Sequence, residues 1–436
     1  MLFLIQELTH QNLLIMKNNS LLLLMIFSVF LTDAQELVQS YYYADGYAVL
    51  PKMLLERKND IVIPFSITKN KEKKAGVLYM NIDNSIKEAI LFEGKDNYVI
   101  NEIIESKNGN LLVAAEGYSE EGQESLYFIE LDENGIINDF VFNEDGNELD
   151  PFAILELREN IVIGGFVKSS KLVSSSFYNM YSEKQMIYVA EFTKSGKKIW
   201  SKAFDLVGYE KGICNQMIKQ DNGIVLLCHA NKIGEQMAPI LINIDFKGNV
   251  KNIVEVGISN NIVIGSRIVN INNQTKLVGS YMNDVSYLFN YLFNENLKVI
   301  ETSEYIMPGR ILINSFDENT IVGSIFKDKT YNNLVINFTN NSCIINEFGS
   351  DKTDMLIGKA GKSFFGYKIG NVNDVISSMM IFNNIDSSLL IDKQKSNLFI
   401  NDNIEYNIEQ KFIKSSINKG IEKVKILNVL DRFISL

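Results

Sequence analysis

Residues 160–166 read NIVIGGF, and residues 186–204 read MIYVAEFTKSGKKIWSKAF. The first run alternates aliphatic residues and ends on small ones, and the second holds two apolar runs separated by the polar turn TKSG. Apolar runs of this length with a period of two, bounded by turn residues, are typical of β-strands rather than helices. This stretch therefore predicts three consecutive antiparallel strands.

The pattern recurs along the chain. A turn residue, alternating aliphatics and a small residue (Pro at the first place) appear at seven places, spaced 43–64 residues apart: Pro64, Ala114, Gly164, Cys228, Gly279, Gly323 and Gly366. Each unit reads as four short strands, and repetition of such units is the signature of a β-propeller. We predict an all-β fold over residues 35–396, a seven-bladed β-propeller of four-stranded antiparallel blades. Eight blades is the alternative, if the two ends pair to make another.

The composition narrows the chemistry. The 436 residues carry a formal net charge of −11, which disfavours binding to nucleic acid. The chain has only 2 His, and one of them, His10, lies in the predicted leader. A lone histidine on an apolar strand, here His229, is more often a core residue than a catalytic one. No phosphate loop, zinc spacing or nucleophile elbow occurs. We therefore predict no catalytic, metal-binding or cofactor-binding residues, and no cofactor.

The N-terminus resembles an export signal. Residues 16–34 read MKNNSLLLLMIFSVFLTDA, with a positive charge, an apolar run and small residues before the expected cleavage site. These are the parts of a secretory signal peptide. The apolar run is about half of the roughly 20 residues that a membrane-spanning helix needs. We expect residues 1–34 to be an upstream segment plus signal peptide, with the mature chain periplasmic, outer-membrane-associated or on the cell surface.

The repeats carry a family resemblance. The stretch at residues 160–218 resembles the blades of secreted β-propeller repeat proteins of Bacteroidetes-type bacteria, and residues 93–98 (EGKDNY) and 349–354 (GSDKTD) look like their acidic inter-blade loops. The resemblance implies a propeller architecture. It implies no particular activity, because this fold hosts many functions.

The C-terminal segment, residues 397–436, breaks the repeat. Residues 397–401 read NLFIN and residues 420–436 read GIEKVKILNVLDRFISL. This segment resembles the front half of the C-terminal sorting domain used by the type IX secretion system. Where that pattern ends its central motif in Gly, this chain has Asp431, and the segment then stops early. The alternative is a set of strands that closes the propeller.

Two cysteines face each other in the predicted fourth unit. Cys214 and Cys228 are symmetric about the turn at Asp221. Opposed residues of a hairpin have Cβ atoms about 4.5–5.5 Å apart, which a disulfide can reach with adjustment. We hypothesise a cross-strand disulfide between them, with two buried thiols as the alternative.

One connection is longer than its counterparts. Between Gly164 and Ile187 the chain reads through VKSSKLVSSSFYNMYSEKQ, which we expect to be a loop. Loops on a rigid scaffold often carry binding, and interfaces favour aromatic anchors. We predict a partner-binding loop that presents Phe177, Tyr178, Met180 and Tyr181.

Together these features predict an exported binding or scaffold module for protein–protein or surface-ligand interaction, without catalysis. Its expected partner is a protein or a cell-surface glycan. One alternative is a component of an outer-membrane protein assembly. The other is a carbohydrate-active propeller enzyme, which would require a carboxylate, Tyr or His cluster at one mouth of the axial channel.

Overall fold

The computed structural model describes residues 39–43, 48–69, 72–93, 97–118, 124–144, 148–175, 178–232, 237–257, 262–282, 284–348, 355–369, 377–382, 388–393, 399–402, 404–409, 415–418, 423–427 and 433–435. Within these residues all regular secondary structure is β-strand. No helix long and apolar enough to cross a membrane is found among them. The predicted signal peptide lies outside the described residues.

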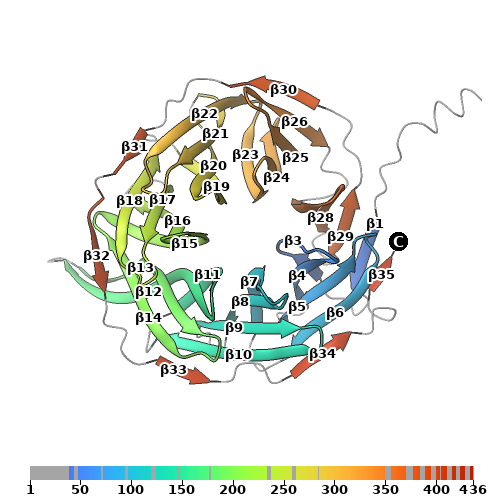
Figure 1. The fold of residues 1–436 in the computed structure, drawn as a ribbon, viewed down its shortest axis with the longest axis horizontal. Helices are drawn as coiled ribbons and strands as arrows, with labels where there is room; N and C mark the ends of the chain where they lie inside the picture. Colours follow the sequence, from blue (N-terminus) through green and yellow to red (C-terminus); the bar gives the residue numbers. More distant parts are fainter. Residues whose placement is uncertain are drawn as a thin grey trace, which may run out of the picture.

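The strands of the described residues form six sheets that lie around a common centre in a propeller-like arrangement (Figure 1). Neighbouring strands within each sheet are antiparallel, apart from one parallel bridge in the largest sheet. The first three sheets along the chain contain β2 (Ala48–Pro51), β3 (Leu55–Glu56), β4 (Asp60–Lys69), β5 (Glu72–Asn81) and β6 (Ile86–Glu93); β7 (Asn97–Glu105), β8 (Leu111–Tyr118), β9 (Glu124–Asp132) and β10 (Gly135–Glu144); and β11 (Glu148–Leu157), β12 (Asn160–Ser175), β13 (Tyr178–Thr193), β14 (Lys198–Leu206), β15 (Tyr209–Gln220), β16 (Gly223–Lys232), β17 (Met237–Ile244) and β18 (Val250–Gly257).

The remaining sheets follow in chain order. They contain β19 (Ile262–Ile271), β20 (Gln274–Met282), β21 (Ser286–Phe293) and β22 (Val299–Met307); β23 (Arg310–Phe316), β24 (Thr320–Lys327), β25 (Thr330–Phe338) and β26 (Ser342–Phe348); and β27 (Met355–Ala360), β28 (Ser363–Ile369), β29 (Ser377–Phe382) and β1 (Gln39–Tyr43). Strand β1 pairs with β29, so the N-terminal part of the described chain completes the last sheet. The ring is thereby closed by main-chain hydrogen bonds.

The C-terminal segment runs around the outside of the ring. Its short strands each pair antiparallel with an outer strand and meet β26, β18, β14, β10, β6 and β1 in that order, which is backwards around the ring (Figure 1). These strands are β30 (Ser388–Asp392), β31 (Phe399–Asn401), β32 (Tyr406–Glu409), β33 (Ser415–Asn418), β34 (Lys423–Leu427) and β35 (Phe433–Ser435). They cover sheet edges that would otherwise expose unpaired backbone groups.

The apolar runs of the strands explain the core. In each sheet the aliphatic and aromatic side chains on both faces are buried against the two neighbouring sheets, as in β16 and the strands that follow it. The cluster around Phe65, Leu78 and Phe365 joins the first sheet to the last. Apolar packing between sheets, rather than disulfides, therefore holds the ring together.

After the first sheet, the first strand of every four-stranded antiparallel unit carries a β-bulge. Register shifts interrupt β7, β11, β15, β19, β23 and β27 where they pair with the second strand. Strands β7, β11, β15, β19 and β23 are also those nearest the centre (Figure 1). Bulges re-aim side chains, so the residues beside them are the ones that can depart from simple in-and-out alternation.

The prediction of an all-β, propeller-like fold is confirmed. The expected loop after Gly164 is wrong: β12 and β13 continue as a paired hairpin through Leu172↔Tyr181 to Ser175↔Tyr178. The physical reason is that the ladder consists of main-chain hydrogen bonds, which polar residues also make, so the extra length became strand rather than loop.

Candidate functional site

The bulges place polar side chains between neighbouring inner strands. Gln216, directly after the bulge of β15, accepts the Ile268 N–H on Oε1 at 2.9 Å and donates from Nε2 to the Ile268 carbonyl at 2.9 Å. Glu102 holds the same place after the bulge of β7 and accepts the Ile154 N–H on Oε2 at 2.5 Å. Side chains at this level thus connect the first strand of one sheet to the first strand of the next.

Arg267 lies at the corresponding position of β19, directly after its bulge. Its Nη2 donates to the Asn314 carbonyl of β23 at 3.3 Å, and Asn314 Nδ2 donates onward to the Leu356 carbonyl of β27 at 2.7 Å. The chain of contacts therefore continues from sheet to sheet at one level of the ring.

The charges of Glu102 and Arg267 affect each other's pKa although their strands lie on opposite sides of the ring (Figure 1). The positive charge of Arg267 lowers the pKa of Glu102, and the charge of Glu102 raises the pKa of Arg267. These opposite effects mean that the two charges lie within electrostatic reach of each other. Glu102, Arg267 and His229 form what we call the axial cluster.

Burial decides the protonation states in the axial cluster. It raises the pKa of the Glu102 carboxyl to about 8, and the opposing effects of the Ile154 N–H and Arg267 are smaller. It also lowers the pKa of the Arg267 guanidinium, which Glu102 partly restores. At pH 7 Glu102 is therefore mostly a neutral carboxylic acid beside a cation, which is the form that can donate a proton.

His229 completes the cluster from β16. Its Nδ1 lies 2.7 Å from Asn215 Oδ1, the bulge residue of β15. Burial, followed by the positive charge of Arg267, lowers the pKa of His229 to about 4. The imidazole is thus neutral at pH 7, and with Nδ1–H donated to Asn215 its Nε2 is left as an acceptor. It is a polar member of the site and not only a core residue.

The arrangement offers acid and anion-binding chemistry without a metal. No group of three or more His, Cys, Asp or Glu residues within the described part of the chain could hold a metal ion. A neutral carboxyl can protonate a leaving oxygen, a guanidinium can bind an anion or hydroxyls, and a neutral imidazole can accept a hydrogen bond.

The structure places the predicted cysteine pair as expected. Cys214 and Cys228 are direct partners in the pairing of β15 with β16. In contrast to the hypothesised disulfide, both are buried free thiols in the structure, and Cys214 Sγ approaches the Gln216 carbonyl at 3.8 Å. Burial, and then the contact with Cys214, raise the pKa of Cys228, so the Cys228 thiol is held in its unreactive protonated form.

The predicted binding residues lie far along the β12–β13 hairpin. Tyr178, Met180 and Tyr181 belong to β13, and Phe177 lies outside the described residues. They are not brought together with the axial cluster, because the hairpin end extends outward from the ring (Figure 1).

Sequence reasoning missed Glu102 and Arg267. Both are ionisable residues inside largely apolar inner strands. The strands read Val-Ile-Asn-Glu-Ile-Ile at residues 99–104 and Gly-Ser-Arg-Ile-Val at residues 265–269. At the equivalent position β11 has Ala153 and β15 has Gln216. A charge at this repeat position is the signal that could have identified them.

Comparison with known proteins identifies no family. No protein family matches the chain, and no curated protein matches it. Among solved structures the chain is similar to the β-1,2-mannobiose phosphorylase from Listeria innocua, determined in complex with β-1,2-mannobiose. The TM-score is 0.28 and the identity 10%, over 79% of this chain and 96% of that chain.

This comparison corrects two predictions. The similar structure is that of an enzyme, contrary to the prediction of a binding or scaffold module without catalysis and to the prediction that the protein is not an enzyme. The sequence argument equated scarce histidine with absent acid–base chemistry. Its physical error was to ignore that burial can turn a glutamate into an acid that works near neutral pH.

Proposed function

We propose that this protein is a carbohydrate-active propeller enzyme in which Glu102 is the proton donor. The observation that carries the proposal is the axial cluster, where a mostly neutral Glu102 faces Arg267 across the centre of the ring with His229 beside them. A carbohydrate-active propeller is expected to carry a carboxylate, Tyr or His cluster at one mouth of the axial channel, and the axial cluster supplies a carboxyl and a histidine.

The chemistry follows from the protonation states. Cleavage of a glycosidic bond needs a carboxylic acid that protonates the leaving oxygen while a nucleophile attacks the anomeric carbon. Glu102 supplies that proton and is left as a carboxylate, which the positive charge of Arg267 stabilises. The axial cluster contains one carboxyl and no second carboxylate to deprotonate water, so the nucleophile is an oxyanion such as phosphate, held by Arg267. His229 and Asn314 orient hydroxyl groups.

The test is turnover by the purified full chain. A panel of α- and β-linked oligosaccharides is incubated with and without inorganic phosphate, and released sugars are resolved by anion-exchange chromatography. We expect turnover of at least one linkage, and a loss of about 10²- to 10⁴-fold in Glu102→Gln, the range typical of a missing general acid. The fold should survive because Gln216 makes the same kind of contact at the equivalent position.

Glu159→Gln is the matched control, since Glu159 is an exposed carboxylate at the turn after β11. It should keep wild-type turnover. Equal activity in Glu102→Gln and the wild type, or no turnover of any glycoside in the panel, would contradict the proposal.

We also propose seven blades for the ring. The ten-stranded sheet consists of two meanders, β11–β14 and β15–β18, linked by the single parallel bridge Gln185↔Lys211. Counting these two meanders separately supports the seven repeats seen in the sequence. An experimental density map that resolves each inner strand around the centre would test the count.

Export remains a proposal that rests on residues 16–34. A mature N-terminus at Gln35, detected by mass spectrometry of the protein from the producing cell, would support cleavage and a location outside the cytoplasm. An intact N-terminus would overturn it. The Bacteroidetes-type origin and the type IX sorting role of residues 397–436 stay proposals on the resemblance alone. Deletion of residues 397–436 that leaves secretion unchanged would remove the sorting role.

The β12–β13 hairpin end is our proposed contact surface for a protein partner, an outer-membrane complex or a cell-surface glycan. Its support is the length of the two strands, 16 residues each. Deleting residues 170–182 should abolish capture of that partner while the ring still folds. Unchanged capture by the shortened chain would overturn this role.

A further inference from the structure

Two grooves of similar size open between neighbouring sheets. The charged groove, which Arg57 and Tyr79 line, has a volume of about 520 Å³ between the β2–β6 sheet and the β7–β10 sheet. The polar groove, which Lys276, Asn290 and Phe338 line, has a volume of about 530 Å³ between the β19–β22 sheet and the β23–β26 sheet. Both volumes fall within the range of about 300–1,000 Å³ that is usual for small-molecule sites.

Lys276 occupies a position of the repeat that is elsewhere apolar. It pairs with Leu292, which directly precedes a bulge between the third and fourth strands of its sheet. In the four preceding units the residue before the corresponding bulge pairs in the same way with an aliphatic residue that is 0% exposed. These residues are Val62, Leu112, Val162 and Val225.

Asn290 and Ser303 are polar replacements of the same kind. Asn290 lies two residues before Leu292 and pairs with Ser303. At the place of Asn290 the four preceding units have apolar residues that are all 0% exposed, namely Val77, Phe128, Val189 and Leu241. At the place of Ser303 three of them have Ile90, Phe140 and Val254, and the other has Lys202. One patch of the β19–β22 sheet is therefore polar where the repeat is otherwise largely apolar.

These replacements let the polar groove reach further between its two sheets. Neither Val62 nor Val77 lines the charged groove, whereas their counterparts Lys276 and Asn290 both line the polar groove. The lining also includes Tyr305, which is only 2% exposed. The polar side chains thus border a space that extends toward the buried part of the junction.

The polar side chains of this groove keep hydrogen-bonding capacity. No described residue hydrogen-bonds to the half-buried side chain of Asn290. Lys276 Nζ donates to the Glu318 carbonyl at 2.5 Å, which uses one of the three donors of an ammonium group. A polar group at a position built for packing costs stability unless it finds a partner. A ligand in the groove would supply that partner.

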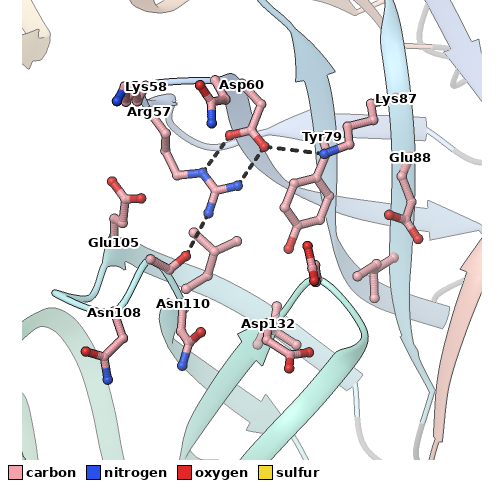
Figure 2. Close-up of a pocket in the computed structure, with 16 residues that line it drawn as sticks. Arg57, Lys58, Asp60, Tyr79, Lys87, Glu88, Glu105, Asn108, Asn110 and Asp132 are labelled. Carbon is pink, nitrogen blue, oxygen red and sulfur yellow. Dashed lines mark hydrogen bonds and ion pairs between the residues drawn. The ribbon is translucent and has the colours of Figure 1, made fainter.

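The charged groove shows the contrasting case. Arg57 donates from Nε and Nη2 to the Asp60 carboxylate, both at 2.6 Å, and from Nη1 to the Gly109 carbonyl of the neighbouring sheet at 3.0 Å (Figure 2). The protein's own groups thus satisfy the guanidinium there. The charged groove serves below as an internal comparison.

The surroundings of Lys276 select the class of ligand. An anion would meet the negative charges of Glu301, Glu318 and Asp317, which already act on Lys276. A wholly apolar ligand would leave the donors of Lys276 and Asn290 without partners. A neutral sugar fits, because its hydroxyls both donate and accept, as the Asn290 amide does.

We propose that the polar groove is a binding site for a neutral oligosaccharide. Asn290 and Lys276 hydrogen-bond to sugar hydroxyls, and the C–H groups of the sugar pack against the ring of Phe338. Lys276 Nζ lies 5.4 Å from the centre of that ring, so the polar contacts and the apolar wall are close enough to contact one sugar unit.

This site goes beyond the proposed enzymatic function and does not rest on it. The polar groove lies between two sheets, whereas the axial cluster belongs to strands around the centre of the ring. Glu102→Gln should therefore lose turnover and keep binding in the groove. Loss of groove binding with retained turnover would overturn only the present inference.

The test is isothermal titration calorimetry of the full chain with maltotriose, cellotriose and mannotriose, and with trigalacturonate as an acidic counterpart. We expect saturable binding of at least one neutral trisaccharide. Asn290→Leu and Lys276→Val should each weaken, by about tenfold or more, the binding that Glu102→Gln retains. Both variants carry the residue type found at the equivalent places, Leu241 and Val225. Their melting temperatures should therefore rise, a result that a purely structural role of Asn290 or Lys276 does not predict.

Asn332→Leu is the matched control, because Asn332 is a half-buried asparagine of β25 outside the groove lining and its change should leave binding unaltered. Glu88→Gln, in the charged groove, should also have no effect. Absence of saturable binding, wild-type affinity in Asn290→Leu, or a lowered melting temperature in both groove variants would overturn the proposal. Tighter binding of trigalacturonate than of every neutral trisaccharide would overturn it as well.

Discussion

The junction between β7 and β11 and the junction between β15 and β19 are built alike and differ in one side chain. In the second, Gln216 uses both amide atoms on the backbone of Ile268. In the first, Glu102 uses one oxygen on the Ile154 N–H. The junction therefore needs only a polar side chain of this length, and an amide can pair with both the N–H and the carbonyl of the opposite residue.

The difference shows what Glu102 adds. A carboxyl in this place costs free energy when ionised, because burial disfavours its charge. The same burial makes it a proton donor near neutral pH. We therefore regard the contact with Ile154 as structural and the proton of Glu102 as functional, and the predictions below separate these two roles.

The largest expected effect comes from placing a carboxyl in the other junction. Gln216→Glu removes the donor to the Ile268 carbonyl and places an acid against that carbonyl. We expect a loss of about 3 kcal/mol in the free energy of unfolding at pH 8, where the carboxyl must ionise. At pH 4 the loss should largely vanish. Urea unfolding at both pH values measures it, and an equal loss at both would contradict the account.

The reciprocal change, Glu102→Gln, should remove a pH dependence. Unfolded Glu102 has its usual pKa of 4.5, and folded Glu102 holds its proton to about pH 8. The stability it contributes is thus complete below pH 4.5 and is lost as pH rises through 8, by at most about 1.4 kcal/mol per pH unit. Wild-type stability should fall between pH 6.5 and 8, and the variant's should stay flat. Parallel curves would contradict the burial of this acid.

The contribution of His229 to stability should depend on pH in the opposite direction. Its pKa falls from 6.5 to about 4 on folding, so its contribution is present above pH 6.5 and is lost as pH drops through 4. His229→Gln should abolish this acid-side loss while keeping a polar partner for Asn215. Unfolding curves at pH 4.5 and 7 provide the measurement. A variant that loses as much stability as the wild type at low pH would show that another group is responsible.

The smallest effect concerns the bulge residue of the first junction. Asn101 Nδ2 donates to the Pro151 carbonyl at 2.7 Å and to Glu116 at 3.2 Å. Asn101→Ala should cost about 1 kcal/mol, the usual worth of such contacts. Thermal melting detects this as a small decrease in the melting temperature. No change in melting temperature would mean that the backbone alone holds the bulge.

The sequence was sufficient to predict the propeller-like ring but not the polar residues near its centre. Repeats around Ala114, Gly164 and Cys228 predict stacked sheets because their near-continuous apolar runs leave apolar groups on both faces of each strand. The bulges shift the register by one or two residues at Glu102 and Arg267, and no periodicity reveals such a shift. Only the closed ring shows that these two residues, far apart in the chain, face each other.

The tail and the long hairpin illustrate the same limit. The sequence marks residues 397–436 as outside the repeat, but the pairing of β31–β35 with successive outer edges depends on main-chain hydrogen bonds that any strand can make. Likewise residues 170–182 contain many polar residues and suggest a loop, whereas backbone pairing extends β12 and β13. Sheet edges recruit strands with little demand on side chains.

The most direct test of the central claim is the titration of Glu102 itself. With ¹³C-labelled glutamate, the carboxyl resonance of Glu102 is assigned by its loss in Glu102→Gln and followed from pH 3 to pH 10. We predict a midpoint near 8, and a rise in that midpoint when Arg267 is changed to Met, because the cation lowers the pKa of the carboxyl. A midpoint near 4.5, unmoved by the Arg267 change, would show that Glu102 is an ordinary carboxylate and that the centre of the ring holds no proton donor.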